Sequence, residues 1–497
     1  MKRKLFLNTV TSLLLQVVTL ICGLILPRLI LGQYGSAVNG LVQSITQFLG
    51  IIAFMELGMG QVIQSALYKP LLDRDMPQVS CILASGGKFF RRIAYALVVY
   101  AAVLMVVYPM ITDTGFDWAY TAWLIVAISI SSFAQYYFGI IDRLLLNADQ
   151  RGYIQYISQI GCLILNTAIC VALIHSGASI QAVKLTSALI YLARPLLVRA
   201  YIRRRYRVDR KIQYSGEPIR QKWNGIAQHS AAVVLENTDT VVLTLMSTLE
   251  NVSIYSVYHL IVYGVRSIYF SATAGIQSAM GKLWAQNDED TLNKAFGGME
   301  TVLHFSAVFL FSCAGLLILP FVQVYTKGVT DVNYIQPAFA LLMVLAYGSQ
   351  CLKTPYNIMV MAAGHYKQTQ HCHIISAAIN VVITVAAVYS WGLVGVAVGT
   401  LAGMFYQMVW LAHYVSRKLL CMPMLRFFGH LAADVLTAGL IWAAASWIPM
   451  GDQGYLSWLV LAVSVALIAL VITGAVAMLL YKRTLLDAYR WFTQKAS

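Results

Sequence analysis

Charge is scarce in this chain. Asp, Glu, Lys and Arg make up 11% of its 497 residues, whereas hydrophobic residues make up 59%. A soluble domain carries about 25% charged residues, so the composition excludes a soluble globular protein and indicates a polytopic membrane protein. The sequence also lacks a P-loop, which argues against ATP hydrolysis as a driving force.

Cysteine pairs are absent as well. The eight cysteines are scattered, mostly inside apolar segments, and none forms a Cys-X-X-Cys motif. We interpret them as small buried hydrophobic residues rather than disulfides or metal ligands. His365, His371 and His373 lie close in sequence but without further ligands, so we expect no metal and no other cofactor.

Long outer loops are missing too. Apolar windows predict fourteen membrane helices, near residues 9–31, 38–66, 93–112, 118–141, 153–175, 178–198, 224–246, 251–281, 301–325, 333–362, 372–390, 392–415, 430–449 and 455–480. The first is too long for a cleaved signal peptide. With a cytoplasmic N-terminus, the outer loops hold only Lys184 and Lys327 of the 35 basic residues, as the positive-inside rule demands. We therefore expect a bacterial cytoplasmic membrane protein with both termini inside.

The formal net charge of +15 gathers on the inner side, above all in residues 199–222, which hold nine Lys and Arg. We expect this segment to contact anionic membrane lipids and expect no nucleic-acid partner. It also divides the chain into an N-terminal six-helix bundle (1–198), a basic cytoplasmic linker (199–222) and a C-terminal six-helix bundle (223–415). Two additional helices (430–480) follow.

The two bundles repeat. Ile63-Gln64-Ser65-Ala66 recurs as Ile276-Gln277-Ser278-Ala279 at an offset of 213, and Asn166 and Thr186 match Asn380 and Thr400 at an offset of 214. Six helices per copy give both copies the same orientation, so their symmetry axis lies along the membrane normal. In transporters with this arrangement the substrate binds between the halves near the bilayer midplane.

Ionisable residues interrupt two adjacent apolar segments. His229, Glu236 and Asp239 lie in 224–246, and His259 and Arg266 lie in 251–281. Each central charge costs about 2.5–3.5 kcal/mol to insert, so such residues usually face a bundle interior or a watery path. The spacings of three and seven place each set on one helix face. We interpret the two helices as one wall of a cavity for a charged solute, with Arg266 either contacting that solute or pairing with Glu236 or Asp239.

Four other residues within the predicted spans are candidates for the same cavity. Arg28 and Arg194 lie near span ends, where snorkelling to the interface is the alternative. Lys353 lies deeper in its span, beside Pro355, which predicts a kink. Glu56 either neutralises a cation, binds a coupling ion or makes a helix-packing hydrogen bond.

Several stretches resemble the polysaccharide-type (Wzx-like) flippases of the multidrug/oligosaccharidyl-lipid/polysaccharide exporter superfamily. They are Met55–Gly60, Asn147–Arg151 with Tyr153, Arg194–Leu196, Asn237–Val242 with Val252 and Tyr255, Ala362–Lys367 and Trp391–Thr400. The resemblance runs from about residue 5 to residue 480. It departs from the family pattern at Glu56, where Asp is common, and in the lack of a second-half counterpart of Arg28.

The resemblance implies a flippase for an oligosaccharide linked through pyrophosphate to a polyprenol, working by alternating access, with other polysaccharide-assembly membrane proteins as possible partners. Arginine suits this substrate because it is the best geometric match for phosphate. The alternatives are a flippase for the lipid II type of peptidoglycan precursor and a multidrug or metabolite antiporter. A glycan-processing membrane enzyme fits least, since we predict no catalytic residue and the outer loops are short.

Overall fold

The structure is a computed structural model that describes residues 2–52, 57–112, 115–206, 208–210, 212, 234, 238–273, 276–286, 288–448 and 454–494. Ten helices within these residues are long and apolar enough to cross a membrane. The first of them, 6–50, bends and contains the span predicted at 9–31 and the first part of the span predicted at 38–66. The chain is an all-α polytopic membrane protein, and this prediction of the fold class is confirmed.

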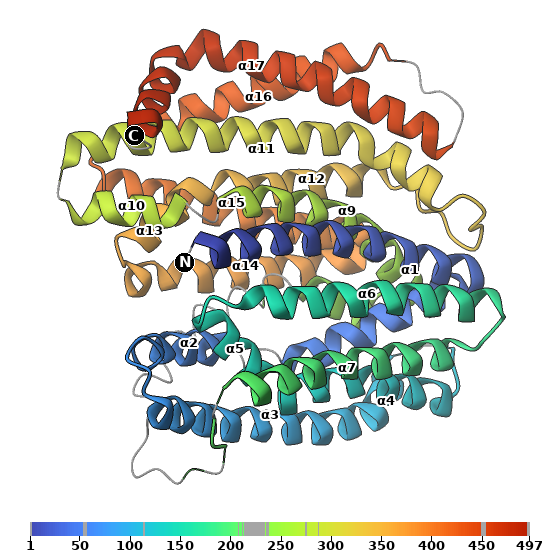
Figure 1. Cartoon of the computed structure of the whole chain (residues 1–497). Helices are drawn as coiled ribbons and strands as arrows, with labels where there is room; N and C mark the ends of the chain where they lie inside the picture. The colour runs from blue at the N-terminus through green and yellow to red at the C-terminus, as the bar shows by residue number, and fades with distance from the viewer. Residues whose placement is uncertain are drawn as a thin grey trace. The chain divides into compact units, whose positions relative to one another are not determined.

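The helices form two compact units, one of residues 1–233 with 248–253 and one of residues 234–247 with 254–497. The first contains α1 (Lys2–Gly50), α2 (Leu57–Leu72), α3 (Met76–Ile111), α4 (Trp118–Ala134), the π-helix η2 (Gln135–Gly139), α5 (Ile140–Ala148), α6 (Gly152–His175) and α7 (Ile180–Arg205). The second contains most of α9 (Leu249–Thr273), then α10 (Ile276–Ala285), α11 (Glu289–Tyr325), α12 (Pro337–Leu352), α13 (Thr354–Ala362), α14 (Tyr366–Trp391), α15 (Leu393–Lys418), α16 (Leu425–Ala445) and α17 (Tyr455–Gln494) (Figure 1).

The helices bend or end at residues whose backbone chemistry favours it. Gly35 has φ 83° inside α1, a conformation that glycine adopts without steric cost, and it separates the first two predicted spans. Lys353 separates the end of α12 at Leu352 from the start of α13 at Thr354, and Pro355 lies in the first turn of α13, which confirms the predicted kink. The span predicted at 118–141 instead continues through η2 and α5 to Ala148.

In the first unit, α6 packs between α1 and α7 (Figure 1). The start of α1 is fixed to the α5–α6 turn by polar contacts. Lys4 forms an ion pair with Asp149 at 3.2 Å, and Asn8 Oδ1 accepts from the Tyr153 amide at 2.7 Å. The Tyr206 hydroxyl, just beyond α7, also donates to Asp149. Burial of this hydroxyl and its bond to the carboxylate raise the pKa of Tyr206, which keeps it a proton donor at neutral pH.

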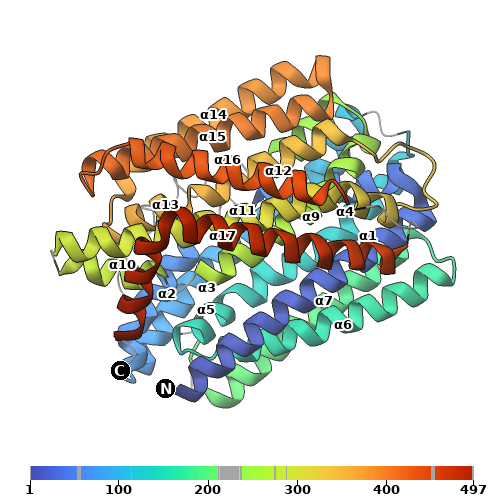
Figure 2. The same ribbon diagram turned by 90° about the horizontal axis from the view of Figure 1, so that it is seen from above.

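In the second unit, α14 and α15 lie side by side (Figure 2). Glycine permits the close approach: a Cβ on Gly399 would lie 2.8 Å from the Thr384 amide nitrogen and 2.9 Å from the Asn380 carbonyl oxygen. The Gly-rich stretch at the start of α15 therefore serves helix packing. Elsewhere in this unit α11 packs against α12, α16 and α17 (Figure 1).

The outward face of α17 is apolar. Leu456, Leu459, Val463 and Leu467 recur at helical spacing, and each is more than half exposed. Such a stripe would promote aggregation in water, whereas in a bilayer it contacts lipid tails. It supports the assignment as a multi-pass membrane protein.

Candidate functional site

A cavity of about 300 Å³ opens inside the first unit where the helices are irregular. Its residues come from α4, η2, α5, α6 and α7, and they are Ser131, Ser132, Gln135, Gly139, Ile140, Arg143, Gln155, Gln159, Leu163, Tyr191, Arg194, Pro195 and Val198. A π-turn inside an α-helix is rare and frequently marks a functional site. Pro195 adds a second irregularity, because it has no N–H to bond the Tyr191 carbonyl. Both local distortions thus meet at the same cavity, which we call the arginine cavity.

Two arginines give this cavity its charge. Arg143 extends from α5 and Arg194 from α7, and among the described residues that line the cavity none is acidic. The nearest acid in sequence, Asp142, is fully buried and forms an ion pair with Arg210. Guanidinium groups with neighbouring amides and hydroxyls suit an anion such as a phosphate or pyrophosphate.

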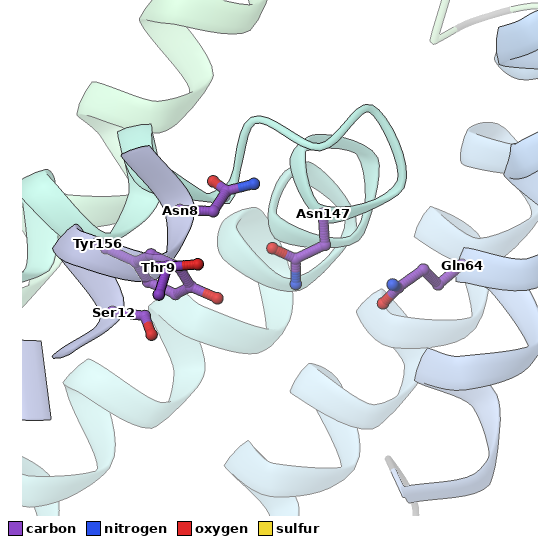
Figure 3. A pocket seen from close by; sticks show the side chains of 7 residues that line it. Asn8, Thr9, Ser12, Gln64, Asn147 and Tyr156 are labelled. Atoms are coloured by element: carbon purple, nitrogen blue, oxygen red, sulfur yellow. The ribbon is translucent and has the colours of Figure 1, made fainter. Parts of the chain in front are cut away.

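A second hollow, of about 370 Å³, lies between α1, α2 and the α5–α6 turn, and we call it the neutral pocket. It is lined by Asn8, Thr9, Ser12, Gln64, Asn147, Gly152 and Tyr156. In Figure 3 the side chain of Asn147 lies between the α1 residues and Gln64. No lining residue carries a charge, and amides and hydroxyls both donate and accept hydrogen bonds. This chemistry suits an uncharged polyhydroxyl group.

Asp239 is the centre of a buried polar site in the second unit. The residue is 2% exposed, and its carboxylate accepts from the hydroxyls of Tyr255 at 3.0 Å and Thr400 at 2.6 Å. Asn380 Nδ2 lies 3.4 Å away, while Asn380 Oδ1 is a buried acceptor with no partner among the described residues. One carboxylate among hydroxyl and amide oxygens is a donor set for a hard monovalent cation or a proton.

His259 and Arg266 share one face of α9, as their spacing predicts. The His259 ring stacks between Tyr255 and Tyr263, with centroid distances of 5.5 Å to each. The Arg266 guanidinium lies 5.6 Å from the Tyr263 ring centre and 5.2 Å from that of Phe270. A ladder of rings therefore connects the Asp239 site to Arg266. Of the two acids considered as alternative partners of Arg266, Asp239 is held by hydroxyl and amide groups, and Glu236 falls outside the described residues.

Lys353 and Arg28 are the remaining predicted residues that the structure describes. Lys353 donates to the Gln407 side chain, whose amide nitrogen lies 2.6 Å from His373 Nδ1. Arg28 is half-buried on α1 and lies beside Gly32. Glu56, His229 and Glu236 fall outside the described residues.

Arg143 was missed by the sequence reasoning. It lies two residues beyond the predicted end of its span at residue 141, so it was assigned to an inner loop. The apolar run Leu144–Leu146 that follows it was the available signal for a longer helix. Tyr255 and Tyr263 were missed as ladder members because aromatic residues at helical spacing are usual in any membrane helix.

Solved structures show which fold this is. The chain is similar to an inward-facing multidrug-resistance MATE family transporter of the MOP superfamily, with a TM-score of 0.61 at 14% identity over 82% of this chain and 98% of the other. A mutant of the Vibrio cholerae MATE transporter VcmN gives 0.56 at 12% identity, over 85% and 98%. An outward-facing MATE transporter of the MOP superfamily gives 0.52 at 12% identity, over 84% and 96%.

The fold is therefore that of the MATE transporters, across most of the chain. No protein-family model and no curated protein matches the sequence. At this sequence identity the likeness shows the fold alone.

Proposed function

We propose that this protein is a membrane transporter that flips a polyprenyl-pyrophosphate-linked oligosaccharide from the cytoplasmic to the outer leaflet. The arginine cavity carries the proposal. Its lining includes Arg143 and Arg194, which lie on two candidate membrane spans, together with amides and hydroxyls and with no acidic side chain among the described lining residues. A cavity for cationic drugs calls for acids instead. A pyrophosphate that crosses hydrocarbon needs this compensation for its negative charge.

The neutral pocket supports the glycan part of the substrate. Its volume of about 370 Å³ accommodates a sugar ring, and its lining of amides, hydroxyls and one tyrosine matches sugar hydroxyls. The fold likeness to both inward-facing and outward-facing transporters supports alternating access of the two halves.

A competition experiment on purified protein separates this function from its alternatives. Bare polyprenyl pyrophosphate should displace a fluorescent polyprenyl-pyrophosphate glycan, while a cationic dye should not. Displacement by the dye together with no displacement by the pyrophosphate lipid would favour the multidrug reading. That second candidate draws on the ring ladder of α9 and on buried Asp239, which suit an aromatic cation. Competition by a series of lipid-linked saccharides that includes peptide-bearing lipid II tests the peptidoglycan alternative, which predicts that lipid II displaces the label best.

We further propose that Asp239 binds the cation that drives the cycle. Asp239→Asn keeps the size and hydrogen bonding of the side chain but removes its charge. Transport should then lose its dependence on Na⁺, and its rate should fall to the Na⁺-free rate of the unmodified protein. The measurement is transport rate against Na⁺ in proteoliposomes. Asp290→Asn, on the exposed first turn of α11, should retain the dependence, and retention in Asp239→Asn would remove Asp239 from coupling.

The orientation of the chain is open to a direct test. Cys421 is exposed in the turn between α15 and α16, which the basic-residue distribution places in the cytoplasm. A membrane-impermeant maleimide should therefore label Cys421 in inverted vesicles and leave it unlabelled in intact cells. Thr330→Cys, at an exposed position of the α11–α12 turn, should show the opposite pattern. Labelling of Cys421 from outside would reverse the topology.

A further inference from the structure

A cluster of buried ionisable side chains lies in the second unit, away from the Asp239 site and the α9 ladder. Helices α11, α13 and α16 contribute it, and its members are Glu300, His304, Tyr356, Arg426, His430 and Asp434. All of them except Arg426 are at most 4% exposed. Ionisable groups buried in a membrane bundle are costly and mark functional sites by default. The substrate sites proposed above leave this cluster unused.

The members form a continuous chain of contacts. Arg426 Nε lies 2.9 Å from Glu300 Oε2, and its side chain is 31% exposed. The Tyr356 hydroxyl lies 2.6 Å from Glu300 Oε1 and 3.5 Å from His304 Nε2. His304 Nδ1 lies 2.7 Å from Asp434 Oδ2. A path of polar atoms therefore leads from a partly exposed arginine to a buried carboxylate.

This path enters from one face of the membrane. Arg426 lies at the first turn of α16, and Asp434 lies about 12 Å further along the same helix at 1.5 Å per residue. Gly297 of α11 makes the entrance possible, because a Cβ at that position would collide with the Arg426 guanidinium. The basic residues Arg417 and Lys418 precede α16 on the same side, which is the cytoplasmic face in the predicted topology.

The charge balance of the cluster is incomplete. With both histidines neutral it holds two carboxylates and one guanidinium, which leaves one negative charge uncompensated in a low-dielectric interior. Asp434 Oδ1 and His430 Nδ1 also have no hydrogen-bond partner within the described part of the chain. One proton on His304 would turn its contact with Asp434 into a charge-assisted pair.

Other ionisable groups face the pair from the neighbouring helices. The His430 ring lies 5.2 Å from that of His304 and stacks on Tyr481 of α17 at 4.4 Å. Tyr481 is the residue at which α17 departs from helical geometry. Tyr269 of α9 lies near Asp434 as well. A change of charge at His304 therefore alters the electrostatic environment of His430 and of Tyr481, at the bend of α17.

We propose that the His304–Asp434 pair is a proton-binding site, loaded through Glu300 and Tyr356 from the membrane face where α16 begins. A proton arriving on Glu300 passes to the Tyr356 oxygen as the tyrosine's own proton moves to His304 Nε2. The imidazolium then donates from Nδ1 to Asp434. One proton is added, only O–H and N–H bonds change, and the cluster becomes neutral.

The binding of the proton can be tested without transport. In purified protein with ¹⁵N-labelled histidine, the ring signal that disappears in His304→Gln should change from the charged to the neutral form as the pH is raised. Asp434→Asn should abolish that change, because the charged ring loses its partner. The control His371→Gln, at an exposed position of α14, should leave the signal unaffected. A His304 ring that keeps one charge state throughout overturns the proposal.

The use of this proton in transport rests on the proposed function. The rate in proteoliposomes should change up to about tenfold per pH unit on the limiting side, as for one titrating group. His304→Gln should flatten this profile, while His371→Gln should retain it. If the unmodified protein moves no lipid-linked glycan but the His304 ring still titrates, the proposed function fails and the proton site stands. If the His304 ring titrates in the unmodified protein but His304→Gln keeps the same pH–rate profile, the site binds a proton without taking part in the transport cycle.

Discussion

Replacing both Arg143 and Arg194 by glutamine should reduce the flipping of a polyprenyl-pyrophosphate glycan at least about 100-fold. Hydrogen bonds to charged groups contribute about 1.5–3 kcal/mol each, and 1.4 kcal/mol corresponds to a tenfold change in rate. Glutamine keeps the polar lining of the arginine cavity and removes its charge. Initial rates of leaflet exchange in proteoliposomes, normalised to the amount of folded protein, give the measurement.

Matched variants separate the charge of the cavity from its packing. The double lysine variant keeps both charges but loses the bidentate geometry of arginine, so it should recover part of the rate. Arg204→Gln removes an exposed charge from the same helix α7 and should leave the rate unchanged. A double glutamine variant that flips at the unmodified rate would show that the arginine cavity does not hold the pyrophosphate.

Arg266→Ala should abolish flipping while the amount of protein in the membrane stays near normal. The structure refines the reason. The guanidinium rests on the rings of Tyr263 and Phe270; such contacts hold a cation in place, and the guanidinium geometry suits a phosphate. Arg266→Lys should restore part of the activity because the charge persists. Flipping rates together with membrane protein levels provide the readout.

A structural role for Arg266 makes a different prediction. Arg266→Met preserves an apolar side chain of similar length against the two rings and removes the charge. If Arg266 only packs, this variant should transport well, and substantial activity would exclude contact with the headgroup. Tyr263→Phe keeps the ring under the guanidinium, so it serves as the control and should transport normally.

The helical architecture was accessible from the sequence because long apolar runs have few alternative structures in a membrane. The break at Gly35 and the kink before Pro355 follow from the backbone chemistry of those residues, and both were predictable. The continuation of α4 through η2 to Ala148 was not, because an apolar window ends at the first charged pair, here Asp142 and Arg143. A buried ion pair between Asp142 and Arg210 lets the helix carry that charge inward.

The candidate sites were less predictable than the fold. Asp239 was found because an acid in an apolar segment is conspicuous, but its hydroxyl partner Thr400 comes from α15, which is distant in sequence. Asn380 and Thr400 stood out only as members of the internal repeat. Glu300 and His304 escaped notice because they lie at the predicted edge of a span, where charges are ordinary. Only the packing of α16 against α11 brings them together with Asp434.

The most direct test of the central claim is leaflet exchange by the purified protein. Proteoliposomes loaded with a fluorescent polyprenyl-pyrophosphate oligosaccharide are treated with a membrane-impermeant quencher, without ATP. We expect the unmodified protein to expose the inner-leaflet half of the label to the quencher, while the Arg143→Gln, Arg194→Gln protein keeps it protected. If the inner-leaflet label stayed inaccessible to the quencher with the unmodified protein, under every Na⁺ and pH gradient applied, the assignment as a flippase of this lipid class would be contradicted.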